Sequence, residues 1–160
     1  MSQVVLGVDP GSRDTGFGVI QEEREKLLHL ASGRIHAGSR AALENRLRQI
    51  YDGLTELIQQ HRPQALALEE IFLASNVRSA FILGQVRGVV LLAAAQSSLP
   101  IFQYSATTVK KAVVGYGQAT KAQVQLMIEH LLGLKITNEH AADALAVSVC
   151  HLFHSRWPKG

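Results

Sequence analysis

Short apolar runs and amphipathic stretches alternate along the whole chain. The first run, Val4–Asp9, is rich in β-branched residues and stops at Pro10. A proline pushes the residue before it toward extended backbone, so this run predicts a strand that ends at Asp9. Two further strand-like runs, Gly16–Ile20 and Leu27–Ile35, are separated by the polar segment 21–26. The first part of the chain therefore predicts three strands, with an antiparallel hairpin after the first.

The rest of the chain predicts helices separated by short strands. Apolar residues spaced four and three apart between Leu43 and Ile58 form the stripe of an amphipathic helix that ends before Pro63. The remaining predicted elements are strand Ala65–Glu69, helix Ser79–Gln96, strand Pro100–Tyr104, a helix from the capping box at Thr120 to Gly133, and helix Glu139–His154. This order predicts an α/β fold: a mixed five-stranded sheet flanked by helices, in a single domain spanning residues 1–160.

Composition narrows the class of protein. The chain has 160 residues, of which 47% are hydrophobic and 18% charged, as expected for one globular domain. Its longest uninterrupted apolar stretch, Gly88–Ala95, is far shorter than the roughly 20 residues of a membrane-spanning helix. The first residues lack the pattern of a secretory signal, so we expect a soluble, cytoplasmic protein. The single cysteine, Cys150, excludes an internal disulfide and a CxxC site.

The charge balance permits a polyanionic partner without requiring one. Sixteen Lys and Arg residues oppose thirteen Asp and Glu residues, which gives a net charge of +3 and a pI of about 9.2. Like charges form no long run, so a nucleic-acid surface would have to be assembled by folding.

Acidic residues lie at the ends of predicted elements. Asp9 and Glu69 each end an apolar strand, where a buried and unpaired carboxylate would be costly. The carboxyl ends of neighbouring strands in an open α/β sheet share one crevice, so the two acids could converge there. His140 and Asp143 are three residues apart on the last predicted helix and hence on one face. A third element could thus bring two more ligands to the same place.

Gathered carboxylates without matching basic residues indicate a divalent cation. Mg²⁺ and Mn²⁺ take oxygen ligands and often keep waters for substrate phosphates. Two such ions, roughly 3.5–4 Å apart, would orient an attacking water and stabilise the leaving oxygen of an in-line displacement. The sequence therefore indicates phosphodiester hydrolysis.

Each of these residues also has a purely structural interpretation. Asp9-Pro10-Gly11 is common turn chemistry, and strand alternation allows Glu70 instead of Glu69 to face the site. Asp143 could be a surface acid in the first turns of a helix, and His140 a capping or core histidine. His151 and His154, also three residues apart, are better explained by a solvated or packed face.

Four segments together resemble the RuvC family of Holliday-junction resolvases. They are GVDPGSRDTGFGVI at residues 7–20, LEEIF at 68–72, LGQVRG at 83–88 and AADALA at 141–146. Each is modest alone, but their order and spacing over nearly the whole chain make a specific signature. The resemblance implies a ribonuclease H-like fold, a homodimer, and metal-dependent nicking of two symmetry-related strands at a four-way DNA junction, with 5′-phosphate and 3′-hydroxyl ends. It also implies a branch-migration motor as partner.

The resemblance implies roles for particular residues. Asp9, Glu69 and Asp143 correspond to metal ligands, and the position of His140 is often a fourth Asp in the family. Imidazole suits Mn²⁺ better than Mg²⁺, so we expect a stronger relative response to Mn²⁺, while a role for His140 as general base stays open. The remaining residues fall beside DNA: Lys110 and Lys121 at the scissile phosphate, Phe72 at the junction centre, Arg78 at a phosphate, and Arg87 at a phosphate or the dimer interface.

Three other classes compete with this interpretation. Actin-like and sugar-kinase ATPases share an Asp-Pro-Gly loop but bind nucleotide between two such domains, and 160 residues provide one. A ribosomal-RNA-processing nuclease of the same fold shares the loop, yet the 68–72 and 83–88 segments favour the resolvase. A catalytically silent junction-binding module is disfavoured by the intact set of acids.

Overall fold

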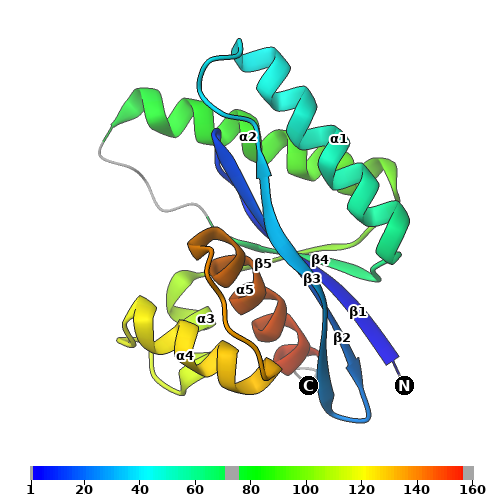
Figure 1. Cartoon of the computed structure of the whole chain (residues 1–160), viewed down its shortest axis with the longest axis vertical. Coiled ribbons are helices and arrows are strands. Elements are labelled where there is room, and N and C mark those ends of the chain that lie inside the picture. The colour runs from blue at the N-terminus through cyan, green and yellow to red at the C-terminus, as the bar shows by residue number, and fades with distance from the viewer. Residues whose placement is uncertain (1, 71–75, 157–160) are drawn as a thin grey trace.

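A mixed five-stranded sheet lies at the centre of the molecule, with helices on both faces (Figure 1). The computed structural model describes residues 2–70 and 76–156. The strands lie in the order β3-β2-β1-β4-β5, and their bounds are β1 Ser2–Asp9, β2 Asp14–Glu23, β3 Lys26–His36, β4 Ala65–Glu69 and β5 Ile101–Tyr104. The first three pair antiparallel, whereas β4 runs parallel to β1 and β5 parallel to β4. The predicted α/β class and mixed five-stranded sheet are confirmed.

Two layers of helices cover the sheet, as Figure 1 shows. One layer holds α1 (Leu43–His61) and α2 (Val77–Gln96), whose buried residues share a core with alternate residues of β1 and β4. The other layer holds α3 (Ala106–Val114), α4 (Lys121–Leu132) and α5 (Glu139–Ser155), which share a second core with the opposite face of those strands. Strand alternation thus supplies both cores.

Two local features differ from the sequence-based expectations. The polar segment 21–26 is mostly strand, and the hairpin turns only at Arg24 and Glu25, which both have positive φ. Backbone pairing continues there although the side chains are polar. Helix α3 was not predicted, because only two of its residues, Val109 and Val113, are buried and they form too short an apolar stripe. Its first turn is capped by the hydroxyl of Ser105, which accepts the N–H of Thr108.

Helix α5 packs unusually close to the sheet. A Cβ on Gly7 would overlap the carbonyl oxygen of Ala144, and a Cβ on Gly16 would overlap the carbonyl oxygen of His140. Ser148 reinforces the contact, because its hydroxyl donates to the carbonyl of Gly18 at 3.0 Å. Gly7 of β1 with Gly16 and Gly18 of β2, here called the glycine seat, therefore allow α5 to pack directly on the sheet. This packing brings the first turns of α5 to the carboxyl end of β1.

Helix α2 is half buried. By length and composition alone it could cross a membrane, with a mean hydropathy of 1.5 over an 18-residue window. Val86, Val90 and Ala94 lie in the core, but Val77, Phe81 and Leu92 are 70%, 71% and 51% exposed. A helix with one face in a core and one apolar face outside is suited to contact a second protein surface.

Candidate active site

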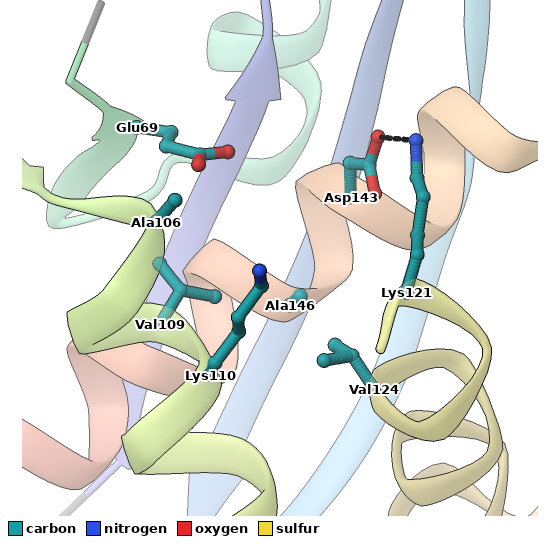
Figure 2. A pocket seen from close by; sticks show the side chains of 8 residues that line it. All are labelled: Glu69, Ala106, Val109, Lys110, Lys121, Val124, Asp143 and Ala146. Carbon is teal, nitrogen blue, oxygen red and sulfur yellow. Dashed lines mark ion pairs between the residues drawn. The ribbon is translucent and has the colours of Figure 1, made fainter. Parts of the chain in front are cut away.

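Three elements bring acidic residues to one end of the sheet. Asp9 ends β1 and Glu69 ends β4, and these strands are parallel neighbours. Asp143 lies in the second turn of α5, which the glycine seat holds against β1 and β2. A pocket of about 250 Å³ lies between Glu69 and Asp143 and is also lined by Lys110 of α3 and Lys121 of α4 (Figure 2).

Of the two glutamates that end β4, Glu69 lines the pocket and Glu70 is exposed. The backbone N–H of Glu70 donates to the carbonyl of Tyr104 at 2.8 Å, which fixes the strand end beside β5. Burial, and then the negative charges of Asp143 and Asp9, raise the pKa of Glu69. The environment therefore resists the ionised form of this carboxylate, as expected where acids converge.

Asp9 is paired with a histidine. His140 Nδ1 lies 3.2 Å from Asp9 Oδ2. Burial, with a further contribution from Asp143, raises the pKa of Asp9 to about 6, although the hydrogen bond from His140 opposes the shift. The candidate site thus contains a carboxylate that changes its charge close to neutral pH.

Asp143 is paired with a lysine. Its Oδ2 lies 3.0 Å from Lys121 Nζ, and Lys121 also pairs with the exposed Glu139 (Figure 2). Burial raises the pKa of Asp143 while Lys121 acts to lower it. Lys110 points into the same pocket in Figure 2 and makes no ion pair with an acid among the described residues. One lysine is therefore already engaged and the other is available to an incoming anion.

The carboxylates of Asp9, Glu69 and Asp143 are of the kind that binds a hard divalent cation, although they are not grouped around one point. Within residues 2–70 and 76–156, no three His, Cys, Asp or Glu side chains are arranged to hold a metal ion. The three carboxylates are partly buried, and burial is the main cause that raises the pKa of each; the charge of Asp143 raises the pKa of Asp9 and of Glu69 further. A divalent cation would relieve this repulsion, and carboxylate oxygens are ligands that Mg²⁺ and Mn²⁺ prefer. The residues present therefore fit such an ion.

Arg87 has a role that the sequence did not indicate. It is only 9% exposed, and its Nη1 donates to the carbonyl oxygen of Glu69 at 2.6 Å while Nη2 donates to Gln103 Oε1. The guanidinium is enclosed beneath the end of β4, which leaves it no room for a phosphate, whereas the dimer-interface alternative stays a prediction. The sequence pattern that could have indicated this burial is the position of Arg87 on the helical face that also carries Val86 and Val90.

None of the remaining described candidates lines the pocket. Arg78 is exposed in the first turn of α2, and Phe72 lies outside the described residues. His151 is buried and its Nδ1 lies 2.7 Å from the hydroxyl oxygen of Tyr104, so the packed alternative applies to it. Cys150 is buried and free.

A sheet of this order, with acids at the ends of its first and fourth strands and on its last helix, defines a nuclease of the ribonuclease H-like fold. A comparison with protein families identifies which one. The family model described as "Crossover junction endodeoxyribonuclease RuvC" matches residues 5–151, and the chain belongs to this family.

Relatives and solved structures agree with this assignment. The chain is 49% identical over 148 residues to a crossover junction endodeoxyribonuclease RuvC of Geobacter sulfurreducens, covering 92% of this chain and 90% of that protein. The Shewanella baltica protein of the same name is 51% identical over 154 residues, with 96% and 88% covered. The structure of T. thermophilus RuvC in complex with Holliday junction substrate has a TM-score of 0.91 and 34% identity, with 96% and 95% covered. The yeast mitochondrial Holliday junction resolvase shares the fold, with a TM-score of 0.61 at 10% identity.

Proposed function

We propose that this chain is a structure-selective endonuclease that resolves four-way DNA junctions by hydrolysing phosphodiester bonds. The observation that carries the proposal is the convergence of Asp9, Glu69 and Asp143 at one end of the sheet, beside two lysines. The family match over residues 5–151 and the likeness to a protein solved with a Holliday junction support DNA as the substrate. The cuts are paired, one in each of two strands of like polarity.

The reaction is an in-line displacement at phosphorus. A water oxygen forms the new bond to phosphorus, the bond to the 3′-oxygen breaks, and this oxygen leaves with a proton. The products are a 5′-phosphate and a 3′-hydroxyl, which a ligase can seal. Two Mg²⁺ or Mn²⁺ ions, held by Asp9, Glu69, His140 and Asp143, would supply Lewis-acid stabilisation of the attacking and leaving oxygens.

Lys110 and Lys121 stabilise the negative charge that develops on the phosphorane oxygens. Lys110 enters the pocket without an acidic partner among the described residues, so it can contact a phosphate directly. Lys121 is bound to Asp143 and Glu139 and delivers its charge to the same space from α4. Cations placed where charge appears in the transition state are typically worth a factor of about 10²–10³ in rate.

A homodimer provides the two cuts. The exposed face of α2 combines Val77, Phe81 and Leu92 with Gly84 and Gly88, whose missing side chains would contact nothing within 4 Å among the described residues. This apolar, glycine-containing face allows a second backbone to approach closely. A two-fold dimer built on it presents two identical sites to the two symmetry-related strands of a junction.

Junction recognition combines shape, backbone charge and stacking. Arg78, exposed in the first turn of α2, contacts a phosphate. Phe72 stacks on an unpaired base at the junction centre, a contact worth about 1–3 kcal/mol. Residues 1–160 act as one domain in the cytoplasm, in association with a branch-migration motor that supplies the junction.

The test is a cleavage assay on a labelled four-way junction. Linear duplex and splayed-arm DNA serve as substrate controls, with Mg²⁺, Mn²⁺ or EDTA, and Asp9→Asn serves as the blank. We expect paired, metal-dependent and ligatable nicks confined to the junction. Binding without cutting in either metal would favour a silent junction-binding module. Cutting of structured RNA without junction binding would favour the RNA-processing relative.

A further inference from the structure

A second group of basic residues lies at the start of β2, the end of β3 and the loops beside them, next to the strand that ends at Asp9. In the strand register, Gly16 of β2 is flanked by Asp9 on β1 and by Arg34 on β3. Two residues earlier, Asp14 pairs with His36. The side of Gly16 that a Cβ would occupy faces His140, and residues two apart on a strand share a face. Arg34, His36 and Asp14 therefore lie on the α5 side, with Asp9.

These residues border an open depression. Its volume is about 570 Å³, and its lining is contributed by the start of β2, the end of β3 and the loop before α1. The ionisable side chains at its edge are Arg13, Asp14, His36 and Arg40. The segment before β2 and the segment after β3 are tied together, because the carbonyl of Arg13 accepts the N–H groups of Ala37 at 2.8 Å and Gly38 at 3.1 Å.

The positive charge of this depression exceeds its negative charge. Asp14 is already shared by two partners: His36 Nδ1 lies 2.6 Å and Arg34 Nη1 3.1 Å from its Oδ1. The hydrogen bond from His36 keeps the pKa of Asp14 low, so the carboxylate stays ionised and anchors these two side chains. Arg13 and Arg40 are exposed and form no ion pair with an acid in the part of the chain that the structure describes.

We infer that Arg13 and Arg40, with Arg34 and His36 held by Asp14, bind the phosphate backbone of the DNA next to the strand that is cut. The inference rests on the proposed function and adds a contact beyond the pocket that Lys110 and Lys121 line. Two strand spacings separate Arg34 from Asp9, roughly 10 Å. This span corresponds to about three nucleotides of duplex, at about 3.4 Å per nucleotide. The contacted phosphate therefore lies within about three nucleotides of the cleaved bond.

An open surface of exposed arginines suits a polymer backbone better than a small phosphorylated ligand. A small anion would need enclosing donors to compensate its desolvation, whereas a strand of DNA is already positioned by the catalytic pocket beside it. The contact is with phosphates, so it places the strand without reading its bases.

The test compares R13Q/R40Q with K26Q/K135Q, which removes the same charge from positions away from the depression. Junction affinity is measured in EDTA from about 50 to 200 mM salt. We expect R13Q/R40Q to weaken binding about tenfold, and to flatten the slope of log affinity against log salt by about 1–2 relative to the control. Single-turnover cleavage by saturating protein should stay within about twofold of the wild type.

A methylphosphonate scan locates the contact. Replacing single phosphates within about three nucleotides of the cut should weaken wild-type binding at one or two positions, and R13Q/R40Q should lose nothing further there. Equal affinities and salt slopes for the two double variants would overturn the inference while the proposed function stands. The same holds if the effect of each methylphosphonate and the effect of R13Q/R40Q add fully at every position. Failure of the wild-type chain to bind the junction would overturn both.

Discussion

The amino group of Lys121 lies 3.0 Å from a carboxylate oxygen of Asp143, although Asp143 is also a proposed metal ligand. One acid is thus shared between a lysine that lowers its pKa and a cation site that requires its ionised form. The lysine favours the ionised form of Asp143, against the burial that raises its pKa, and it would compete with a metal ion for the same carboxylate.

Replacing Lys121 should separate these two effects. For Lys121→Gln we expect the cleavage rate at saturating metal to fall by about 10²-fold, because a cation beside the transition state is lost. The metal concentration at half-maximal rate should not rise, since a competitor for Asp143 has been removed. A metal titration of single-turnover rates measures both quantities. Lys111→Gln, an exposed lysine of α3, is the control, and a raised metal requirement at unchanged maximal rate would contradict the shared-acid interpretation.

Asp9→Asn should abolish cleavage and stabilise the metal-free protein. The pKa of Asp9 is raised to about 6 in the folded state, so the folded chain binds this proton more tightly than the unfolded chain. The cost of ionising Asp9 is fully present above pH 6 and disappears as pH falls toward 4. Removing the charge should therefore raise the free energy of unfolding by about 1–3 kcal/mol at pH 8 and progressively less at lower pH.

Urea unfolding at pH 8 and pH 5 without metal measures this effect. Glu70→Gln, at the neighbouring exposed glutamate, should change neither cleavage nor stability appreciably. Added Mn²⁺ should stabilise the wild type more than Asp9→Asn, because a ligand that binds the folded state raises its stability. Equal stabilisation of both proteins by Mn²⁺ would argue against Asp9 as a ligand.

Arg87→Gln should reduce cleavage through Glu69. The substitution removes the 2.6 Å hydrogen bond to the Glu69 carbonyl and leaves buried acceptors without a donor, so we expect a stability loss of about 2–4 kcal/mol. Below the unfolding transition, the maximal rate should fall and the metal requirement should rise, while junction affinity is kept. Arg87→Lys should restore part of the maximal rate and part of the stability.

Arg78→Gln should have the opposite effect: junction binding becomes weaker, while the cleavage rate of bound substrate changes little.

His140→Asp should move the metal preference toward Mg²⁺. An imidazole beside Asp9 favours Mn²⁺ relative to an all-carboxylate set, and replacing it by a carboxylate removes that bias. Parallel cleavage rates in the two metals give the Mn²⁺/Mg²⁺ ratio for each protein. An unchanged ratio would refute His140 as a ligand, and a change in the pH profile alone would assign it to proton transfer.

Phe81→Glu should weaken self-association. Phe81 is 71% exposed on α2 and lies on the same face as Gly84 and Gly88, so a carboxylate there would be buried without a partner in the proposed dimer. Sedimentation velocity at micromolar concentration should show a shift from dimer to monomer, with single nicks replacing paired nicks. Lys26→Gln on the distant hairpin is the control. A dimer that persists unchanged would place the interface elsewhere.

The sequence could predict the acids of the site because each one ends or begins an element whose limits are visible in the chain. Asp9 precedes a proline, Glu69 ends a short apolar run, and Asp143 lies in the second turn of a helix that is capped by Asn138, with Ala141, Ala142 and Ala144 around it. Their convergence then follows from the parallel pairing of β1 and β4. Pairings across the fold could not be predicted. The contact of Arg87 with Glu69 depends on how α2 packs beneath the sheet, and that of Lys121 with Asp143 on the angle between α4 and α5.

The glycine seat also determines when, during folding, the proposed active site is complete. Asp9 is made among the first ten residues, whereas His140 and Asp143 belong to a helix near the other end of the chain, and they meet only when α5 settles onto Gly7, Gly16 and Gly18. An incomplete or partly folded chain would contain the individual acids without the proposed active site. We therefore expect cleavage activity only after folding is complete and α5 has packed on the sheet.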